Sequence, residues 1–137
     1  MVRLSCVALL GLCLSSSSAI AQCSSEVQVE HVDKKELQQL QQFVNEGHQP
    51  WRLDSQAIAA EKALQLDNTS KERWNVYGVP ATLVGESETR ATYEIKSRHA
   101  GVSYRITVER FDWLLPSAKK WEWMVWTPAE VRITRCN

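Results

Sequence analysis

The sequence predicts an α+β domain with two N-terminal helices packed on a bent antiparallel sheet of about five strands. Two changes along the chain carry this prediction. Apolar residues recur at helical spacing before residue 67, and they recur at every second position after Gly78. A third observation is that Cys23 and Cys136 stand at the two ends of the predicted domain. Helices followed by a run of strands are typical of this fold class.

Residues 1–21 have the pattern of a signal peptide. Arg3 is followed by a short apolar run over 7–14, and Ala19-Ile20-Ala21 has the small-x-small form of a cleavage site. The run is shorter than the roughly 18–20 residues that span a bilayer, and a buried N-terminal helix is the alternative. We expect cleavage after Ala21, a single domain over residues 22–137, no stable membrane insertion afterwards, and a secreted or periplasmic location.

Cys23 and Cys136 would be the two cysteines left after cleavage, because Cys6 and Cys13 lie in the predicted leader. Cysteines in an oxidising compartment usually pair. A disulfide here would close a loop of about 113 positions, for which the chain-entropy model gives at most about 4.7–4.9 kcal/mol. We therefore predict a disulfide that joins the ends of the domain. The segment 27–32 would then be extended and lie beside the last strand.

The two helices are predicted from their caps and apolar spacing. Asp33 and Glu36 form a capping box, and Gly47 is the natural end of the first helix. A second helix begins at Asp54 or Ser55 and fades near 67–68. The predicted apolar faces are Leu37, Leu40, Phe43 and Val44 in the first helix, with Gln38, Gln39, Gln41 and Gln42 outward, and Ala57, Ile58, Ala60, Ala63 and Leu64 in the second.

A hairpin with its loop at residues 98–101 is the strand pairing that the sequence predicts most sharply. This loop sets apolar residues of one strand against apolar residues of the next, and a one-residue slip would destroy the match. The predicted pairs are Ile95 with Tyr104, Tyr93 with Ile106, Ala91 with Val108, Glu94 with Arg105, Thr92 with Thr107, and Arg90 with Glu109.

Two further hairpins and a terminal strand complete the predicted sheet. A loop at 86–88 sets Leu83 against Ala91 and Ala81 against Tyr93. A loop at 116–120 sets Leu115 against Trp121, Trp113 against Trp123, and Phe111 against Val125, with a bulge near 109–110. Val131 and Ile133 form a short last strand. This layout is similar in outline to cystatin-like folds, in which a bent sheet wraps a helix.

Motifs for catalysis, metals and nucleic acids are missing from the sequence. His31, His48 and His99 have no zinc-ligand spacing, and no nucleophile elbow or phosphate loop occurs. The whole chain has 16 basic and 16 acidic residues, which are interspersed, so nucleic acid is disfavoured as a partner. We expect no cofactor and no metal. Whether the protein is an enzyme stays open, although the sequence favours a non-catalytic protein.

Tryptophan is the unusual feature of the composition, with 6 residues. Trp113, Trp121 and Trp123 are predicted to fill the space between sheet and helices, because large aromatic residues dominate buried cores. Trp126 is predicted to face the other way. Trp51 lies in the loop between the helices beside His48 and Arg52, and loops carry function more often than strands. The candidate binding residues are therefore Trp51, His48, Arg52 and Trp126.

Three hypotheses of function follow. The first is an exported non-catalytic interaction module that binds a protein or a cell-envelope component through an aromatic-rich surface. The second is a small-ligand binder or enzyme with a cavity between sheet and helices, near Tyr93, Tyr104, His99, Asp112 and Trp113. The third is an inhibitor of a secreted hydrolase that presents the loop 98–101 or 116–120, with Lys119-Lys120 in the second loop.

Overall fold

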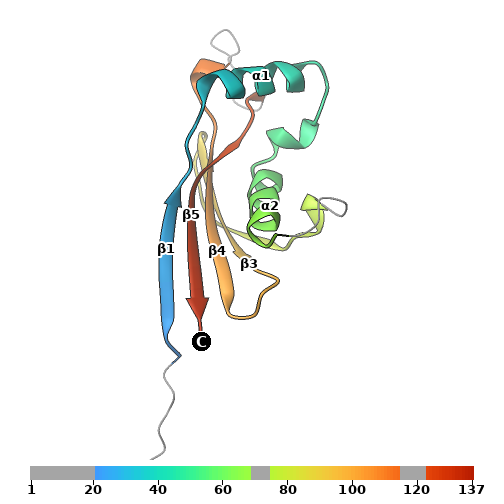
Figure 1. The fold of residues 1–137 in the computed structure, drawn as a ribbon. Helices are drawn as coiled ribbons and strands as arrows, with labels where there is room; N and C mark the ends of the chain where they lie inside the picture. Colours follow the sequence, from blue (N-terminus) through green and yellow to red (C-terminus); the bar gives the residue numbers. More distant parts are fainter. Residues whose placement is uncertain (1–20, 69–74, 115–122) are drawn as a thin grey trace, which may run out of the picture.

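The computed structural model describes residues 21–68, 75–114 and 123–137. The predicted signal peptide, apart from Ala21, lies outside these residues, as do Trp74, Trp121 and the loop 116–120. The described chain contains a five-stranded antiparallel sheet and two α-helices (Figure 1). The fold class and the number of strands agree with the sequence prediction.

The first strand precedes both helices, and the other four strands follow them. The elements are β1 (Cys23–Val29), α1 (Lys34–Asn45), α2 (Ser55–Leu66), β2 (Ala81–Glu86), β3 (Arg90–Lys96), β4 (Val102–Glu109) and β5 (Thr127–Cys136). The strand order in the sheet is β1-β5-β4-β3-β2. The first and last strands therefore lie side by side, as the prediction of a disulfide between the two ends requires.

Cys23 and Cys136 face each other across β1 and β5 and are joined by a disulfide. Their Cα atoms are 4.0 Å apart. The predicted pairing and the predicted extended N-terminal segment beside the last strand are both confirmed. Strands β1 and β5 are thus joined by seven paired positions and by one disulfide bond.

Each helix begins and ends as its sequence predicts. The Asp33 side chain accepts a hydrogen bond from the Glu36 N–H at 3.0 Å. The Asp54 side chain accepts one from the Gln56 N–H at 2.9 Å. Helix α1 ends at Asn45 with Glu46 as its C-cap, and Gly47 follows with a φ of +90° that suits glycine. The His48 N–H then bonds the Phe43 carbonyl, and the two rings stack 4.3 Å apart, which closes the helix end as a Schellman motif.

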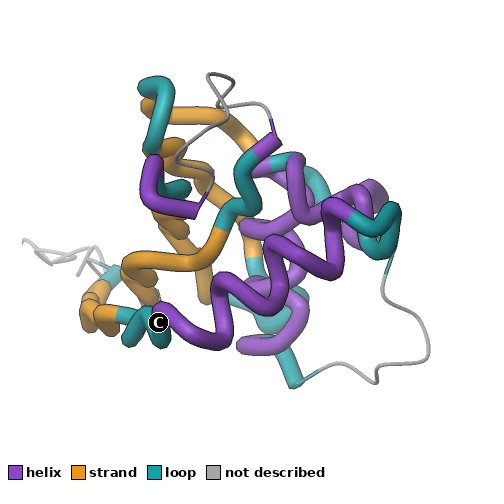
Figure 2. Tube along the Cα trace, turned by 90° about the horizontal axis from the view of Figure 1, so that it is seen from above, coloured by secondary structure: helices purple, strands orange, loops and turns teal. Residues whose placement is uncertain are grey.

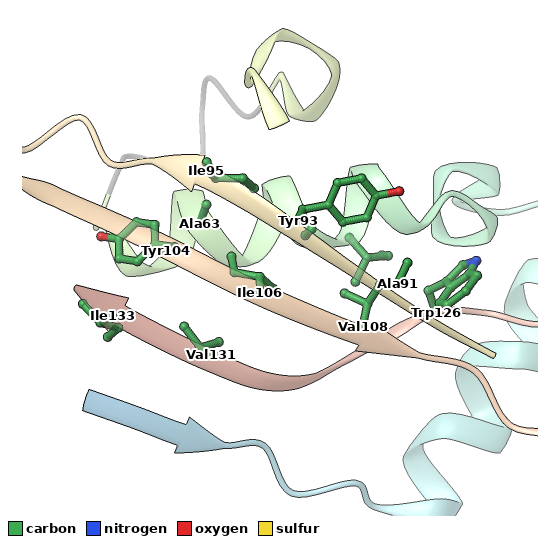
Figure 3. Close-up of a cluster of buried hydrophobic side chains, with 12 residues drawn as sticks. Ala63, Ala91, Tyr93, Ile95, Tyr104, Ile106, Val108, Trp126, Val131 and Ile133 are labelled. Atoms are coloured by element: carbon green, nitrogen blue, oxygen red, sulfur yellow. The ribbon is translucent and has the colours of Figure 1, made fainter. Parts of the chain in front are cut away.

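Only α2 covers the face of the sheet, which corrects the prediction that both helices pack there. The helices lie to one side of the strands (Figure 2), and α1 lies at one end of the sheet (Figure 1). Helix α2 contributes Ile58, Ala59 and Ala63 to the main core, together with β3, β4, β5 and Trp126 (Figure 3). A second cluster beneath α1 contains Leu37, Val44, Leu114 and Val125.

The hairpin of β3 and β4 has every pair that the sequence predicts. The pairing of β2 with β3 was predicted two residues out of register, because Leu83 faces Tyr93 and Ala81 faces Ile95. Next to the turn, where Glu86 faces Ala91, the pairing differs from the predicted one by three residues, and the bulge takes back one of them. The connecting turn begins with a bond from the Ser87 N–H to the Arg90 carbonyl, and a bulge lies between Leu83 and Gly85.

The predicted hairpin between 111–115 and 121–125 is wrong in its described part. Residues Asp112–Leu114 form a short 3₁₀ helix, and β5 begins only at Thr127. Strand β5 pairs with β4 instead, and the register shifts between Thr107 and Val108, rather than at the predicted bulge near 109–110. Pro128 lies at this irregularity, where the missing N–H of proline costs no ladder bond.

The buried glutamine of α1 explains why the segment before β5 leaves the sheet. Gln41 is 2% exposed, although the sequence predicted it to face outward. Its Oε1 accepts from the Val125 N–H at 2.9 Å, and its Nε2 donates to the Trp123 carbonyl at 2.8 Å. This side chain gives the main chain at 123–125 the hydrogen bonds that a neighbouring strand would otherwise supply.

We expect Gln41→Leu to lower the free energy of unfolding by about 2 kcal/mol, because it leaves a buried N–H and a buried carbonyl without partners. The measurement is urea denaturation of the two proteins side by side. Gln42→Leu on the exposed side of the same helix is the matched control and should change stability little. Equal losses in the two variants would contradict the structural role of Gln41.

Candidate binding groove on the open face of the sheet

The face of the sheet opposite α2 bears polar side chains in two adjacent rows that cross the strands. One row contains Ser25, Thr134, Ser103 and Lys96, and the other contains Val27, Arg132, Arg105, Glu94 and Thr82, each directly opposite its neighbour. Alternation along each strand puts these residues on one face and the buried core residues on the other. The sheet thus has one apolar and one hydrophilic face.

A groove of about 510 Å³ runs across this open face. Its lining comes from all five strands: Ser25, Thr82, Glu94, Ile95, Lys96, Ser103, Tyr104, Arg105, Arg132 and Thr134. The side chains of Ile95 and Tyr104 are buried on the core face, so these two residues line the groove chiefly with main-chain atoms. With neighbouring strands about 4.8 Å apart, a groove across five strands is about 19 Å long.

The charges in the groove are arranged unevenly. Arg105 donates to Glu94 from both Nε and Nη2, so its charge is balanced within the sheet. Arg132 lies directly opposite Arg105 on the neighbouring strand. Within the described residues, neither Arg132 nor Lys96 has an ion pair. Like charges directly opposite each other destabilise a sheet, and Glu94 balances only Arg105 of this pair.

Hydroxyl groups surround the charged residues. Ser25 and Thr134 share a hydrogen bond of 3.2 Å across β1 and β5. Ser103 lies between Thr134 and Lys96 in the same row. A hydroxyl both donates and accepts, so this row offers partners to the N–H and carbonyl groups of an extended ligand.

An aspartate at the end of α2 anchors the β3–β4 hairpin, which carries six of the groove residues. Asp67 accepts hydrogen bonds from the Ser97 hydroxyl, from the Arg98 N–H at 3.0 Å, and from the Tyr104 hydroxyl at 2.7 Å. Burial alone would raise the pKa of Asp67, but these hydrogen bonds outweigh it and the pKa lies below its usual value. Burial also raises the pKa of the Tyr104 hydroxyl.

The loop with three of the predicted binding residues is occupied by contacts within the protein. The Arg52 guanidinium lies 4.5 Å from the centre of the Trp51 ring, its Nε donates to Gln49 at 2.7 Å, and it pairs with Glu61 at 3.7 Å. Burial raises the pKa of Glu61, and Arg52 opposes this rise. His48 stacks on Phe43. The structure brings Trp51 and Arg52 together but gives both a role in packing.

Trp126 is in the core, which corrects the prediction that it faces away from the buried aromatic residues. It is 4% exposed, its N–H bonds the Arg52 carbonyl at 2.9 Å, and the Arg110 guanidinium lies 4.5 Å from its ring centre. Trp113 packs against the cluster beneath α1, whereas Trp123 is 55% exposed. The sequence thus misassigned Trp123 and Trp126, because their facing was based on a hairpin that the described residues do not form, whereas Trp113 packs beside buried residues as predicted.

The residues suggested for a cavity between sheet and helices do not converge. Tyr93 and Tyr104 are buried in the core, and their hydroxyls bond Ser55 and Asp67. His99 is in the loop between β3 and β4, while Asp112 and Trp113 follow β4 in the 3₁₀ helix. The space between α2 and the sheet is filled by the side chains in Figure 3.

Of the two loops suggested for hydrolase inhibition, the structure describes only residues 98–101. The Arg98 N–H of that loop is bonded to Asp67. The residues that form the groove were missed at the sequence level, except for the pair of Glu94 and Arg105. Extending the alternation of β4 to β5 would have identified Arg132 and Thr134, but no short turn fixes the register of these two strands.

In the described part of the chain, no three histidine, cysteine or acidic residues are grouped so that they could hold a metal ion. Among the same residues, no helix is both long and apolar enough to cross a membrane. Comparison with known proteins found no matching family model, no matching curated protein and no matching solved structure.

Proposed function

We propose that this protein is an exported, non-catalytic binding module whose open-face groove holds an acidic segment of a partner protein. The observation that carries the proposal is the placement of Arg132 directly beside Arg105. Glu94 balances only one of these two charges. A carboxylate bound between them would offset their repulsion and form charge-assisted hydrogen bonds, which are among the stronger ones in proteins.

The shape of the groove favours an extended ligand. A length of about 19 Å accommodates roughly six residues of extended chain at about 3.3 Å per residue. The hydroxyl row formed by Ser25, Thr134 and Ser103 lies alongside, where main-chain groups of such a segment would need partners. This proposal replaces the aromatic-rich contact surface that the sequence suggested, because Trp126 is buried and Trp51 packs against Arg52.

Export is part of the proposal and rests on two observations. Residues 1–21 have the pattern of a signal peptide. The disulfide between Cys23 and Cys136 is of a kind that persists in oxidising compartments. We also propose the cystatin-like layout as a description of the arrangement, which is supported by the position of α2 across one face of the sheet.

The test is a titration of the oxidised protein with a labelled hexaglutamate peptide, followed by fluorescence anisotropy. We expect Arg132→Ala to weaken binding about tenfold or more, since a hydrogen bond to a charged group contributes about 1.5–3 kcal/mol. We expect Lys96→Ala to weaken it less, because a lysine binds as a point charge without a bidentate fork. Binding should also weaken as salt is raised.

Arg135→Ala is the matched control, because Arg135 is on the same strand but on the other face, where it pairs with Glu26 at 3.0 Å. The affinity of the Arg135→Ala variant for the peptide should equal that of the unaltered protein. Equal losses in the Arg132 and Arg135 variants would contradict the groove as the site. Binding of anionic envelope polymers, with no binding of acidic peptides, would contradict a protein as the partner.

A further inference from the structure

Among the described residues, β1 is an edge strand of the sheet, and no other described strand lies beside its outer side. The Asn137 N–H bonds the Gln22 carbonyl and the Glu30 N–H bonds the Ala129 carbonyl, so even-numbered residues of this segment bond β5. Main-chain groups of an antiparallel strand alternate between its two sides. The N–H and carbonyl groups of Ser25, Val27 and Val29 therefore point away from the sheet.

This edge has one of the features that protect sheet edges from pairing, the charged side chain of Glu26, whose charge is paired with Arg135 at 3.0 Å. All seven residues of β1 are exposed, and its register with β5 is continuous. The strand has no proline, no lysine and no bulge, whereas β2 at the opposite edge follows Pro80 and has a bulge before Gly85. Val27 and Val29 are 50% and 79% exposed on the open face. Strand β2 also exposes Leu83 and Val84, each 46%, so the two edges differ in the proline and the bulge rather than in apolar exposure.

We propose that β1 pairs antiparallel with β1 of a second copy of this protein, about a two-fold axis at Val27. Val27 then faces Val27 of the other copy, and Ser25 faces Val29. Each of these pairs exchanges two main-chain hydrogen bonds, because the groups of these residues point outward. The interface is self-complementary, as a two-fold symmetric dimer requires. This inference is independent of the ligand proposed for the groove.

The side chains select this register over the two neighbouring ones. An axis at Glu26 would set Glu26 against Glu26, and an axis at Gln28 would set Glu26 against Glu30. Like charges directly opposite each other are unfavourable in a sheet. Within each copy, Arg135 pairs with Glu26 at 3.0 Å and Lys62 pairs with Glu30 at 2.6 Å, which offsets part of this repulsion. The axis at Val27 sets Glu26 against Gln28, whose amide already donates to Glu26 at 2.7 Å within one copy. A carboxylate thus faces an amide donor, and no carboxylate faces another.

The exposed valines add to the same pairing. With the axis at Val27, the four valines of the two strands lie on one face, and their contact covers side chains that are otherwise half or more exposed. Helix α2 lies over the other part of the sheet, and β1 is at its outer margin (Figure 1). The Lys62 side chain of α2 reaches this margin on the core face, where it pairs with Glu30 at 2.6 Å, whereas the valines lie on the opposite face.

The test is sedimentation velocity of the oxidised protein over a range of concentrations. We expect a monomer–dimer equilibrium that Val27→Pro abolishes, because proline removes an outward N–H and leaves the bonds to β5 intact. Val27→Thr keeps this N–H and is the matched control, so the dimer should persist. A monomer at every concentration, or a dimer that survives Val27→Pro with the fold intact by circular dichroism, would overturn the proposal.

Two substitutions of Gln28 test the register itself. Gln28→Lys sets an ammonium against Glu26 of the other copy, and Gln28→Glu sets a carboxylate there. Since the pair occurs twice about the axis, we expect the dimer Kd to fall about tenfold in the lysine variant and to rise about tenfold in the glutamate variant. Equal dimer affinities in the two variants would overturn pairing about Val27.

Discussion

Loss of the disulfide between Cys23 and Cys136 is expected to lower the free energy of unfolding by about 3 kcal/mol. The bond closes a loop with a sequence separation of 113 residues. In the chain-entropy model such a loop restricts the unfolded chain by about 4.7 kcal/mol or slightly more, and the measured effect is usually smaller. For a domain of this size, about 3 kcal/mol corresponds to a fall in Tm of roughly 10 °C.

The fold itself should survive, because the disulfide is at the margin of the sheet and the core is elsewhere. The largest fully buried side chains, such as Ile58, Ile106 and Val131, belong to α2, β4 and β5 and do not depend on β1. Without the bond, β1 is held to β5 by its ladder, by the hydrogen bond between Ser25 and Thr134, and by the pair of Glu26 and Arg135. We expect the hydrogen exchange of main-chain amides to become faster in β1 than in the other strands when the bond is lost.

Thermal unfolding of the protein with and without reductant measures the effect. The double variant Cys23→Ser, Cys136→Ser is the control, because reductant should leave its Tm unchanged. Mass spectrometry of the unreduced protein establishes the bond directly, and two free thiols would refute the pairing. Equal Tm values for the oxidised and reduced protein would show that the bond does not contribute to stability.

The parts of the fold that the sequence predicted are those fixed by local signals. The hairpin of β3 and β4 has a short loop and matched apolar residues on both strands, so one register satisfies every pair. The helix caps at Asp33 and Asp54 depend only on the next two or three residues. The disulfide followed from the predicted compartment and from the position of two cysteines at the ends of the domain.

The failures have a common physical cause, which is tertiary contact between distant segments. The alternation at 121–126 fits a strand, yet the Val125 N–H is bonded by a side chain of α1 far away in sequence. The same contact buries Gln41 and turns Trp126 into the core. A polar side chain that serves a distant main-chain segment leaves no periodic pattern, so propensity and spacing cannot identify it.

Only part of the candidate groove could be predicted from the sequence, for a related reason. The pair of Glu94 and Arg105 lies within one hairpin and was predicted. Arg132 comes from β5, which is joined to β4 by a long connection, so nothing in the sequence sets Arg132 against Arg105. A like-charge pair of this kind becomes visible only when the strand order is known, and it is the feature from which we infer the ligand.

The second large effect is expected at Asp67, where Asp67→Ala should lower the free energy of unfolding by about 3 kcal/mol. The carboxylate is 8% exposed and accepts from Ser97, from the Arg98 N–H and from Tyr104. Its removal leaves the buried Tyr104 hydroxyl and a main-chain N–H without their acceptor, and each such loss costs about 1–3 kcal/mol. The hairpin also loses its link to α2.

Urea denaturation measures this loss, and Ser97→Ala is the matched control. That variant removes one donor and leaves the carboxylate with its other two hydrogen bonds, so it should cost about 1 kcal/mol. Equal losses in the Asp67→Ala and Ser97→Ala variants would contradict the view that one carboxylate holds the helix end and the hairpin together.

The same carboxylate should make stability depend on pH in the acid range. Burial raises the pKa of Asp67, but the hydrogen bonds from Ser97, Arg98 and Tyr104 lower it further, so that the folded value lies below the ordinary 3.8. The unfolded chain therefore takes up the proton first as the pH falls. The contribution of Asp67 is complete well above pH 3.8 and is lost as the pH falls through the folded pKa. The Asp67→Asn variant, measured by urea denaturation at a series of pH values, should show a shallower loss of stability below this point than the unaltered protein. Parallel curves for the two proteins would mean that Asp67 has the same pKa in the folded and unfolded states.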